Sequence, residues 1–183
     1  MGKFERYLRN TRPACLEGFK VKKSRFADYE EEVDKEISVW QIACLCGGTE
    51  GRFLGYLLKD YNKEYDGAEF ISPLKFECSK CKAITLLFDT NQHGYSSDID
   101  RREGEVDGVG SCIIRGKGKP KEFLCPKCQK NLFKVKVGFI FWQLSELEDE
   151  FEDRWEDLFM FFICKCKCVG CGEISEPTGF GRL

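Results

Sequence analysis

Closely spaced cysteines constrain this chain more than any other feature of its sequence. Twelve of its 183 residues are cysteine. Eight of them form four pairs with one or two residues between the partners: Cys44 and Cys46, Cys78 and Cys81, Cys125 and Cys128, Cys168 and Cys171. Two thiolates at this spacing can bind one ion, and four thiolates complete a tetrahedral zinc site. The sequence therefore predicts two zinc ions, each held by four of these eight cysteines.

The simplest assignment joins pairs that are neighbours in the chain, so that the first two pairs form one site and the last two form the other. Pairing across the chain stays open, and four thiolates would also suit iron. Cys164 or Cys166 could replace a ligand of the second site, but we expect both to be small core residues. We expect Cys15 and Cys112, which stand alone in the sequence, to be free thiols.

The cysteine turns resemble those of the zinc ribbon, a small β-sheet module with two cysteine turns at its end. The resemblance is best for Cys125/Cys128 with Cys168/Cys171, because the spacing of Cys44/Cys46 is one residue shorter than usual. Glycine follows the second cysteine at Gly47 and Gly172, where it relaxes the turn. The resemblance implies a structural metal. It covers well under half of the chain and implies no particular function.

An internal similarity divides the chain. The segment 73–81 matches the segment 120–128 in its proline, its phenylalanine, both cysteines and a lysine, all at one constant spacing. We interpret this as two related metal-binding halves. The predicted organisation is a charged N-terminal arm over 1–36, a first half over 37–118 with a long loop at 94–110, and a second half over 119–183.

The hydrophobic pattern predicts a strand-rich α+β fold. Apolar residues alternate with lysines in 132–142, as in a half-buried strand. Further strands are expected at 37–46, 52–58, 68–77, 83–88, 109–115 and 159–168. Leu144, Leu147, Phe151, Trp155 and Leu158 instead follow helical spacing among acidic residues. This pattern predicts one amphipathic acidic helix near 144–158.

Composition favours a cytoplasmic protein. The first residues lack the apolar core of a secretory signal, and the longest apolar run, 159–164, is too short to cross a bilayer. Reduced thiols in the cytoplasm favour metal over disulfides. The alternative is a secreted disulfide scaffold. The net charge of −2 indicates no global attraction to nucleic acid or to a membrane.

Both sites are expected to be structural, and no catalytic residue is predicted. A catalytic zinc keeps an open position and usually has histidine or carboxylate ligands. The one histidine, His93, lies far in the sequence from any cysteine pair, and no phosphate-binding glycine loop is present. An enzyme is therefore a less favoured function than a protein that binds another protein or a nucleic acid.

Charge clusters suggest two kinds of partner. Eight acidic residues lie between Glu146 and Asp157. The default interpretation of such a run is a solvated face, but its density is more than solubility demands and favours contact with a basic protein, as in an acidic inhibitor or immunity-type protein. The alternative is a nucleic-acid-binding protein that uses the basic arm over 1–25 together with four lysines near the cysteine turns. These are Lys80, Lys82, Lys127 and Lys130.

Overall fold

The computed structural model describes most of the chain, and every structural statement below concerns that part. It comprises residues 12–26, 37–63, 67–90, 92–93, 115–141 and 159–181. These residues form one antiparallel sheet of nine strands. Two short 3-10 helices, Ala14–Leu16 and Leu58–Asp60, accompany the sheet.

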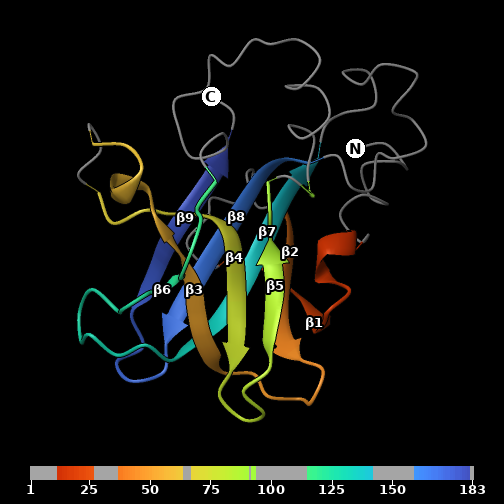
Figure 1. The fold of residues 1–183 in the computed structure, drawn as a ribbon. Coiled ribbons are helices and arrows are strands. Elements are labelled where there is room, and N and C mark those ends of the chain that lie inside the picture. The colour runs from red at the N-terminus through yellow and green to blue at the C-terminus, as the bar shows by residue number, and fades with distance from the viewer. Residues whose placement is uncertain are drawn as a thin grey trace, which may run out of the picture.

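Five strands make up a first layer, which lies behind the second in the view of Figure 1. In spatial order they are β9 (Ile174–Gly181), β8 (Phe159–Cys168), β7 (Phe133–Phe141), β2 (Ile37–Cys44) and β1 (Phe19–Ser24). Strand β7 is central because it pairs with β8 along one edge and with β2 along the other. Every pairing in this layer is antiparallel.

Four strands make up the second layer: β6 (Lys121–Glu122), β3 (Gly51–Leu57), β4 (Phe70–Cys78) and β5 (Ile84–Phe88). The two layers join where Gly51 of β3 pairs with Phe133 at the start of β7. The sheet curls at this junction, so that β4 and β5 lie over β7 and β8 (Figure 1). The result is a half-barrel that encloses the core.

Alternating side chains fill the space between the layers. The odd-numbered residues of β7 are buried and its lysines point the other way, as the two-residue period of a strand requires. Phe162 of β8 stacks on Phe88 of β5, with ring centroids 4.3 Å apart. Phe19 of β1 contacts Phe76 of β4 edge to face at 6.0 Å. Aromatic contacts therefore hold the two layers together.

The curled sheet almost closes on itself along a seam between β1 and β5, its two terminal strands. A Cβ atom placed on Gly18, just before β1, would lie 2.7 Å from Cγ2 of Thr85 in β5. This distance is shorter than a normal carbon–carbon contact. Glycine therefore lets the two strands approach closely where no backbone ladder joins them.

The α+β prediction is wrong. The described residues contain strands and two 3-10 turns but no α-helix, and the fold there is an all-antiparallel sheet. Its core comes from aromatic and β-branched residues on strands, which need no helix to cover them. The acidic segment 144–158, where we expected the helix, lies outside the described residues, as do the loop 94–110 and most of the strand expected at 109–115.

Most of the other predicted strands are present within a residue or two of the expected bounds. Strands β1, β6 and β9 were missed. Lysines interrupt β1, glycine, proline and glutamate interrupt β9, and β6 has only two residues. The division into an arm and two halves stays a prediction. In the structure, strands from all three segments belong to one sheet. Among the described residues, no helix has the length and apolar character needed to cross a bilayer.

The aromatic contact between the layers can be tested with a matched pair of variants. Phe162 is 1% exposed and points into the core, whereas the adjacent Phe161 is only half-buried. We expect Phe162→Ala to lower the free energy of unfolding by about 3–5 kcal/mol. Phe161→Ala should cost less than about 2 kcal/mol. Urea denaturation measures both, and equal losses would contradict the orientation of β8.

Candidate metal centres

All four cysteine turns lie at the same end of the sheet. Strands β2, β4 and β8 end there, and strands β5, β7 and β9 begin there, because neighbouring strands run antiparallel. In Figure 1 this is the lower end of the molecule. Strand direction alone thus gathers cysteines that are far apart in the sequence.

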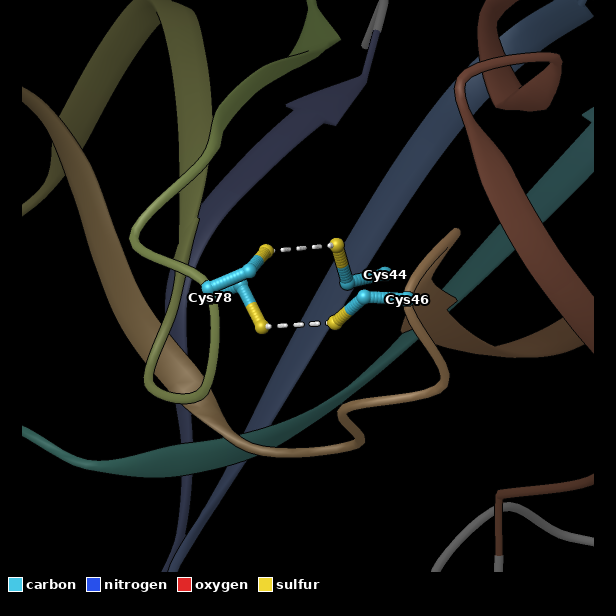
Figure 2. A group of neighbouring side chains, drawn as sticks. Cys44, Cys46 and Cys78 are labelled. Atoms are coloured by element: carbon cyan, nitrogen blue, oxygen red, sulfur yellow. Dashed lines mark hydrogen bonds between the residues drawn. The ribbon is translucent and has the colours of Figure 1, made fainter.

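The first group consists of Cys44, Cys46, Cys78 and Cys81, whose Sγ atoms all lie within 4.8 Å of one another. Cys44 and Cys81 are 3.5 Å apart, and Cys46 and Cys78 are 3.6 Å apart. Figure 2 shows the sulfur atoms of Cys44 and Cys46 facing those of the turn between β4 and β5. Cys44 and Cys78 are buried, whereas Cys46 and Cys81 reach the surface.

The second group repeats this arrangement with Cys125, Cys128, Cys168 and Cys171, again within 4.8 Å of one another. The Sγ atoms of Cys125 and Cys171 are 3.6 Å apart, and those of Cys128 and Cys168 are 3.5 Å apart. Only Cys171 is fully exposed. Both groups therefore sit at the surface of the sheet with their inner sulfurs buried.

The sulfur spacing fits a tetrahedral metal site. Four sulfurs around zinc at about 2.3 Å lie roughly 3.8 Å apart, close to the spacings in both groups. A disulfide needs about 2.05 Å between its sulfurs. The geometry is therefore that of two four-cysteine groups able to hold metal ions. These are the eight cysteines that the sequence singled out, grouped as chain neighbours.

Backbone hydrogen bonds shape the cysteine turns. In the turn after Cys78, the N–H of Cys78 donates to the carbonyl of Ala83, and the N–H of Lys82 donates to the carbonyl of Cys78. The turns that start at Cys125 and at Cys168 have the same two bonds at the same spacing. The turn at Cys44 closes one residue earlier, as its shorter Cys-x-Cys spacing requires.

The residue after the second cysteine has a positive φ in all four turns. Glycine occupies the position at Gly47 (φ 87°) and Gly172 (φ 79°), as the sequence indicated. Lys82 (φ 62°) and Gln129 (φ 59°) adopt the same conformation in the other two turns. For these two side chains the left-handed conformation is strained by roughly 1–2 kcal/mol.

Backbone N–H groups also set the acidity of the thiols. The N–H of Gly48 donates to the sulfur of Cys46 at 3.4 Å, and with the thiol of Cys81 it lowers the pKa of Cys46 to about 7. At Cys44 the N–H of Cys46 lowers the pKa, but burial and the neighbouring thiols raise it to about 12. N–H donors of this kind stabilise a thiolate, the form of cysteine that binds metal.

The second group has the same division. Burial raises the pKa of Cys168, but the N–H of Cys171 and the thiol of Cys128 lower it overall to about 7. The N–H of Glu173 lowers the pKa of Cys171, whereas burial and the other three thiols raise it to about 12. Each group therefore has one thiol that ionises near neutral pH.

A single row of paired residues connects the two groups across the sheet. Cys78 pairs with Gly51, Gly51 pairs with Phe133, and Phe133 pairs with Cys168. Three strand spacings separate Cys78 from Cys168, which is about 14 Å measured along the curled sheet. A Cβ atom on Gly51 would lie 2.3 Å from the carbonyl oxygen of Glu77. Only glycine fits at this junction.

The other cysteines in the described part of the chain lie apart from both groups. Cys164 and Cys166 are fully buried in the core and belong to neither group. Burial raises the pKa of the Cys164 thiol well above its ordinary value. Cys15 is also buried in the core, and Cys112 lies outside the described residues. Metal ligation by the eight grouped cysteines stays a prediction.

His93 lies with a polar cluster at the opposite end of β5, not with the cysteines. Its Nδ1 accepts a hydrogen bond from the N–H of Asp89 at 3.0 Å. Arg115 donates twice to the buried carboxylate of Asp89, at 3.1 and 2.7 Å. Sequence analysis missed this cluster, because nothing in the sequence pairs Asp89 with Arg115. The ion pair joins the two ends of the segment between β5 and β6.

Comparison of the chain with protein-family models, with curated proteins and with solved structures gave no significant match in any of the three. The resemblance to a zinc ribbon therefore rests on the cysteine turns alone.

The strained turn position gives a test of the turn geometry. We expect Lys82→Gly to raise the free energy of unfolding by about 1 kcal/mol, because glycine adopts a positive φ without a steric cost. Lys80→Gly removes the same charge from the same turn at a position without positive φ. It should be neutral or destabilising. Urea denaturation at fixed zinc concentration compares the two, and an equal effect would contradict the assigned turn.

Proposed function

We propose that the protein is a zinc-stabilised binding protein whose two four-cysteine sites are structural. The observation that carries this proposal is the pair of four-sulfur groups, each within 4.8 Å and composed of cysteine alone. Four thiolates fill the coordination shell of zinc and leave no open position for a substrate. Such a site contributes folding energy and not chemistry. We propose a reducing, cytoplasmic environment for it, since the ligands must remain thiolates.

The first site joins parts of the sheet that no backbone ladder connects in the described residues. The first group links the end of β2 to the turn between β4 and β5, and β2 has no hydrogen-bonded pairing with either strand in the described residues. Cys44 at the end of β2 pairs with Phe19 at the start of β1. The first group therefore lies at the lower end of the seam between β1 and β5 and closes it there. The second group links the loop 125–128 to the turn between β8 and β9.

The energetic consequence is large. Binding of a structural zinc contributes on the order of 10 kcal/mol to the folded state in small zinc-dependent peptides. The net stability of a whole domain is only about 5–15 kcal/mol. Two such sites at one end of the sheet would therefore decide whether that end stays folded.

The metal proposal is tested by comparing two buried cysteines. Cys125 belongs to the second group and Cys164 does not, although both are fully buried. We expect two zinc ions per chain in the wild-type protein and in Cys164→Ala, but one in Cys125→Ala. Elemental analysis of protein purified without added zinc gives the count. Titration of accessible thiols before and after chelation checks it, because chelation should release eight thiols.

Either of two results would contradict the proposal. One is a protein that contains no metal and has its grouped cysteines oxidised. The other is a zinc content that falls equally in Cys125→Ala and Cys164→Ala, which would mean that general destabilisation and not ligand loss removes the metal.

We retain a basic protein as the first class of partner, with the acidic run from Glu146 to Asp157 as its contact. Carboxylates at this density in the sequence attract a basic partner and raise its rate of association. Reversing the charge of Glu152, Asp153, Glu156 and Asp157 should abolish capture of such a partner. The zinc content should stay unchanged. If the charge-reversed variant still binds the basic partner, this role is contradicted. As a control, binding of the partner to the wild-type chain should weaken as salt is added.

A further inference from the structure

The outer face of the first layer carries a cluster of lysines. Residues 135 and 137 of β7 and residues 164 and 166 of β8 are buried in the core. The residues that alternate with them therefore point to the opposite face. Four of these residues are lysine: Lys134, Lys136, Lys165 and Lys167.

The register of the sheet places these lysines directly opposite one another. Lys134 of β7 pairs with Lys167 of β8, and Lys136 pairs with Lys165. Like charges in direct cross-strand positions destabilise a sheet. Folding alone would favour an acidic residue in one member of each pair. The arrangement instead concentrates positive charge on one surface.

These four lysines line a groove of about 320 Å³, together with Phe26, Gln41 and Ile174. The lining follows two neighbouring rows of the sheet. Gln41, Lys136 and Lys165 form one row, and Lys134, Lys167 and Ile174 form the other. Phe26 closes the upper end by packing on Gly138, where a Cβ atom would lie 2.6 Å from its ring. We call this surface the lysine groove.

Acidic neighbours compensate part of the charge. Lys134 lies 3.6 Å from Glu50, and Lys165 lies 3.8 Å from Glu176 and 5.0 Å from the ring centre of Phe26. Both ion pairs are long, and each has an acidic partner that is about a third or more exposed, so solvent screening weakens them. A multivalent anion in the groove can therefore compete with them.

We propose that the lysine groove binds the phosphate backbone of a single-stranded nucleic acid. Two lysines on one strand, such as Lys134 and Lys136, are two positions apart, which corresponds to about 6.8 Å along the strand. This distance is of the same order as the spacing of successive phosphates along a nucleic-acid strand. Lys22 of β1 extends the upper row beyond Gln41 and is exposed.

The spacing of the cations, and not their type, favours a phosphate backbone. In the described part of the chain, every cation that lines the groove is a lysine. A lysine ammonium acts as a point charge toward phosphate and carboxylate alike, so the regular rows of lysines are the feature that matches a chain of phosphates. Strands β7 and β8 also pair along both edges. A peptide therefore cannot join them as an added strand.

The shape favours a single strand over a duplex. The groove lies on the face of a sheet, and the described residues around it offer no helix or protruding ribbon to enter a major groove. Ile174 at its rim is 49% exposed and can contact an unpaired base or sugar. The inference rests on the proposed function as a zinc-stabilised binding protein and adds to it a second ligand, with a surface of its own.

Two triple variants with equal charge change test the proposal. The groove variant is Lys134→Gln, Lys136→Gln and Lys167→Gln, which spares the nearly buried Lys165. The control variant is Lys80→Gln, Lys82→Gln and Lys127→Gln, which changes the lysines of the cysteine turns. Fluorescence anisotropy with a labelled single-stranded oligonucleotide of mixed sequence measures affinity between 50 and about 200 mM salt, a range in which phosphate contacts weaken strongly.

The proposal expects the wild-type and control proteins to bind alike and the groove variant to bind roughly tenfold or more weakly. Loss of three phosphate contacts should also reduce the slope of log K against log salt by about 2, at roughly 0.7 per contact. Failure of the wild-type protein to bind at low salt would overturn the proposal, and so would equal weakening in both variants. Competition by polyglutamate as effective as that by oligonucleotide would overturn it in favour of an acidic protein.

Zinc content separates this proposal from the one on which it rests. Both variants keep all eight grouped cysteines, so each should contain two zinc ions per chain. A groove variant that binds weakly and keeps its zinc supports both proposals. Zinc-loaded wild-type protein that fails to bind overturns only the groove. A wild-type protein without zinc overturns the structural metal sites, whatever its affinity for the oligonucleotide.

Discussion

The seam between the two layers is the constraint on which the rest of the structure depends. Within the described residues, β1 and β5 end the hydrogen-bonded path that runs through β2, β7, β3 and β4, and Gly18 and Thr85 approach each other there without a ladder. Aromatic contacts fill the interior behind this gap. At the lower end, the first cysteine group spans the gap, and the row through Gly51 and Phe133 carries that connection to the second group.

One alternation of side chains supports both parts of the account. Strands β7 and β8 direct aromatic, valine and cysteine side chains into the core and lysines to the outer face. The inner side chains hold the layers together. The outer lysines form a concentrated positive surface on rigid elements, which keeps the cations in register without ordering a loop on binding. The core fixes the register of the strands and thereby also fixes the spacing of the lysines. In the proposed function, the zinc sites hold the ends of these strands in place.

Some features of the sequence predicted the structure well, and others did not. The cysteine pairs predicted the two groups, because residues two or three apart on a tight turn stay together in any fold. The strand at 132–142 was predictable from strict alternation. The α+β class was wrong, because the described residues form an all-antiparallel sheet without an α-helix. The helical pattern that suggested this class belongs to 144–158, which lies outside them. Strand β1 was missed because its lysines masked a short alternation. The lysine groove and the contact between Asp89 and Arg115 could not be predicted, since both depend on long-range strand register.

The most direct test of the central claim is X-ray absorption spectroscopy at the zinc edge on protein purified with its native metal. We expect a first shell of four sulfur atoms per zinc at about 2.3 Å, with no nitrogen or oxygen ligand. This result would confirm that both cysteine groups are closed structural sites. A shell that contains oxygen or nitrogen, or an average of fewer than four sulfurs, would contradict it. The metal would then have an open position, and the protein would have to be reconsidered as a metal-dependent catalyst.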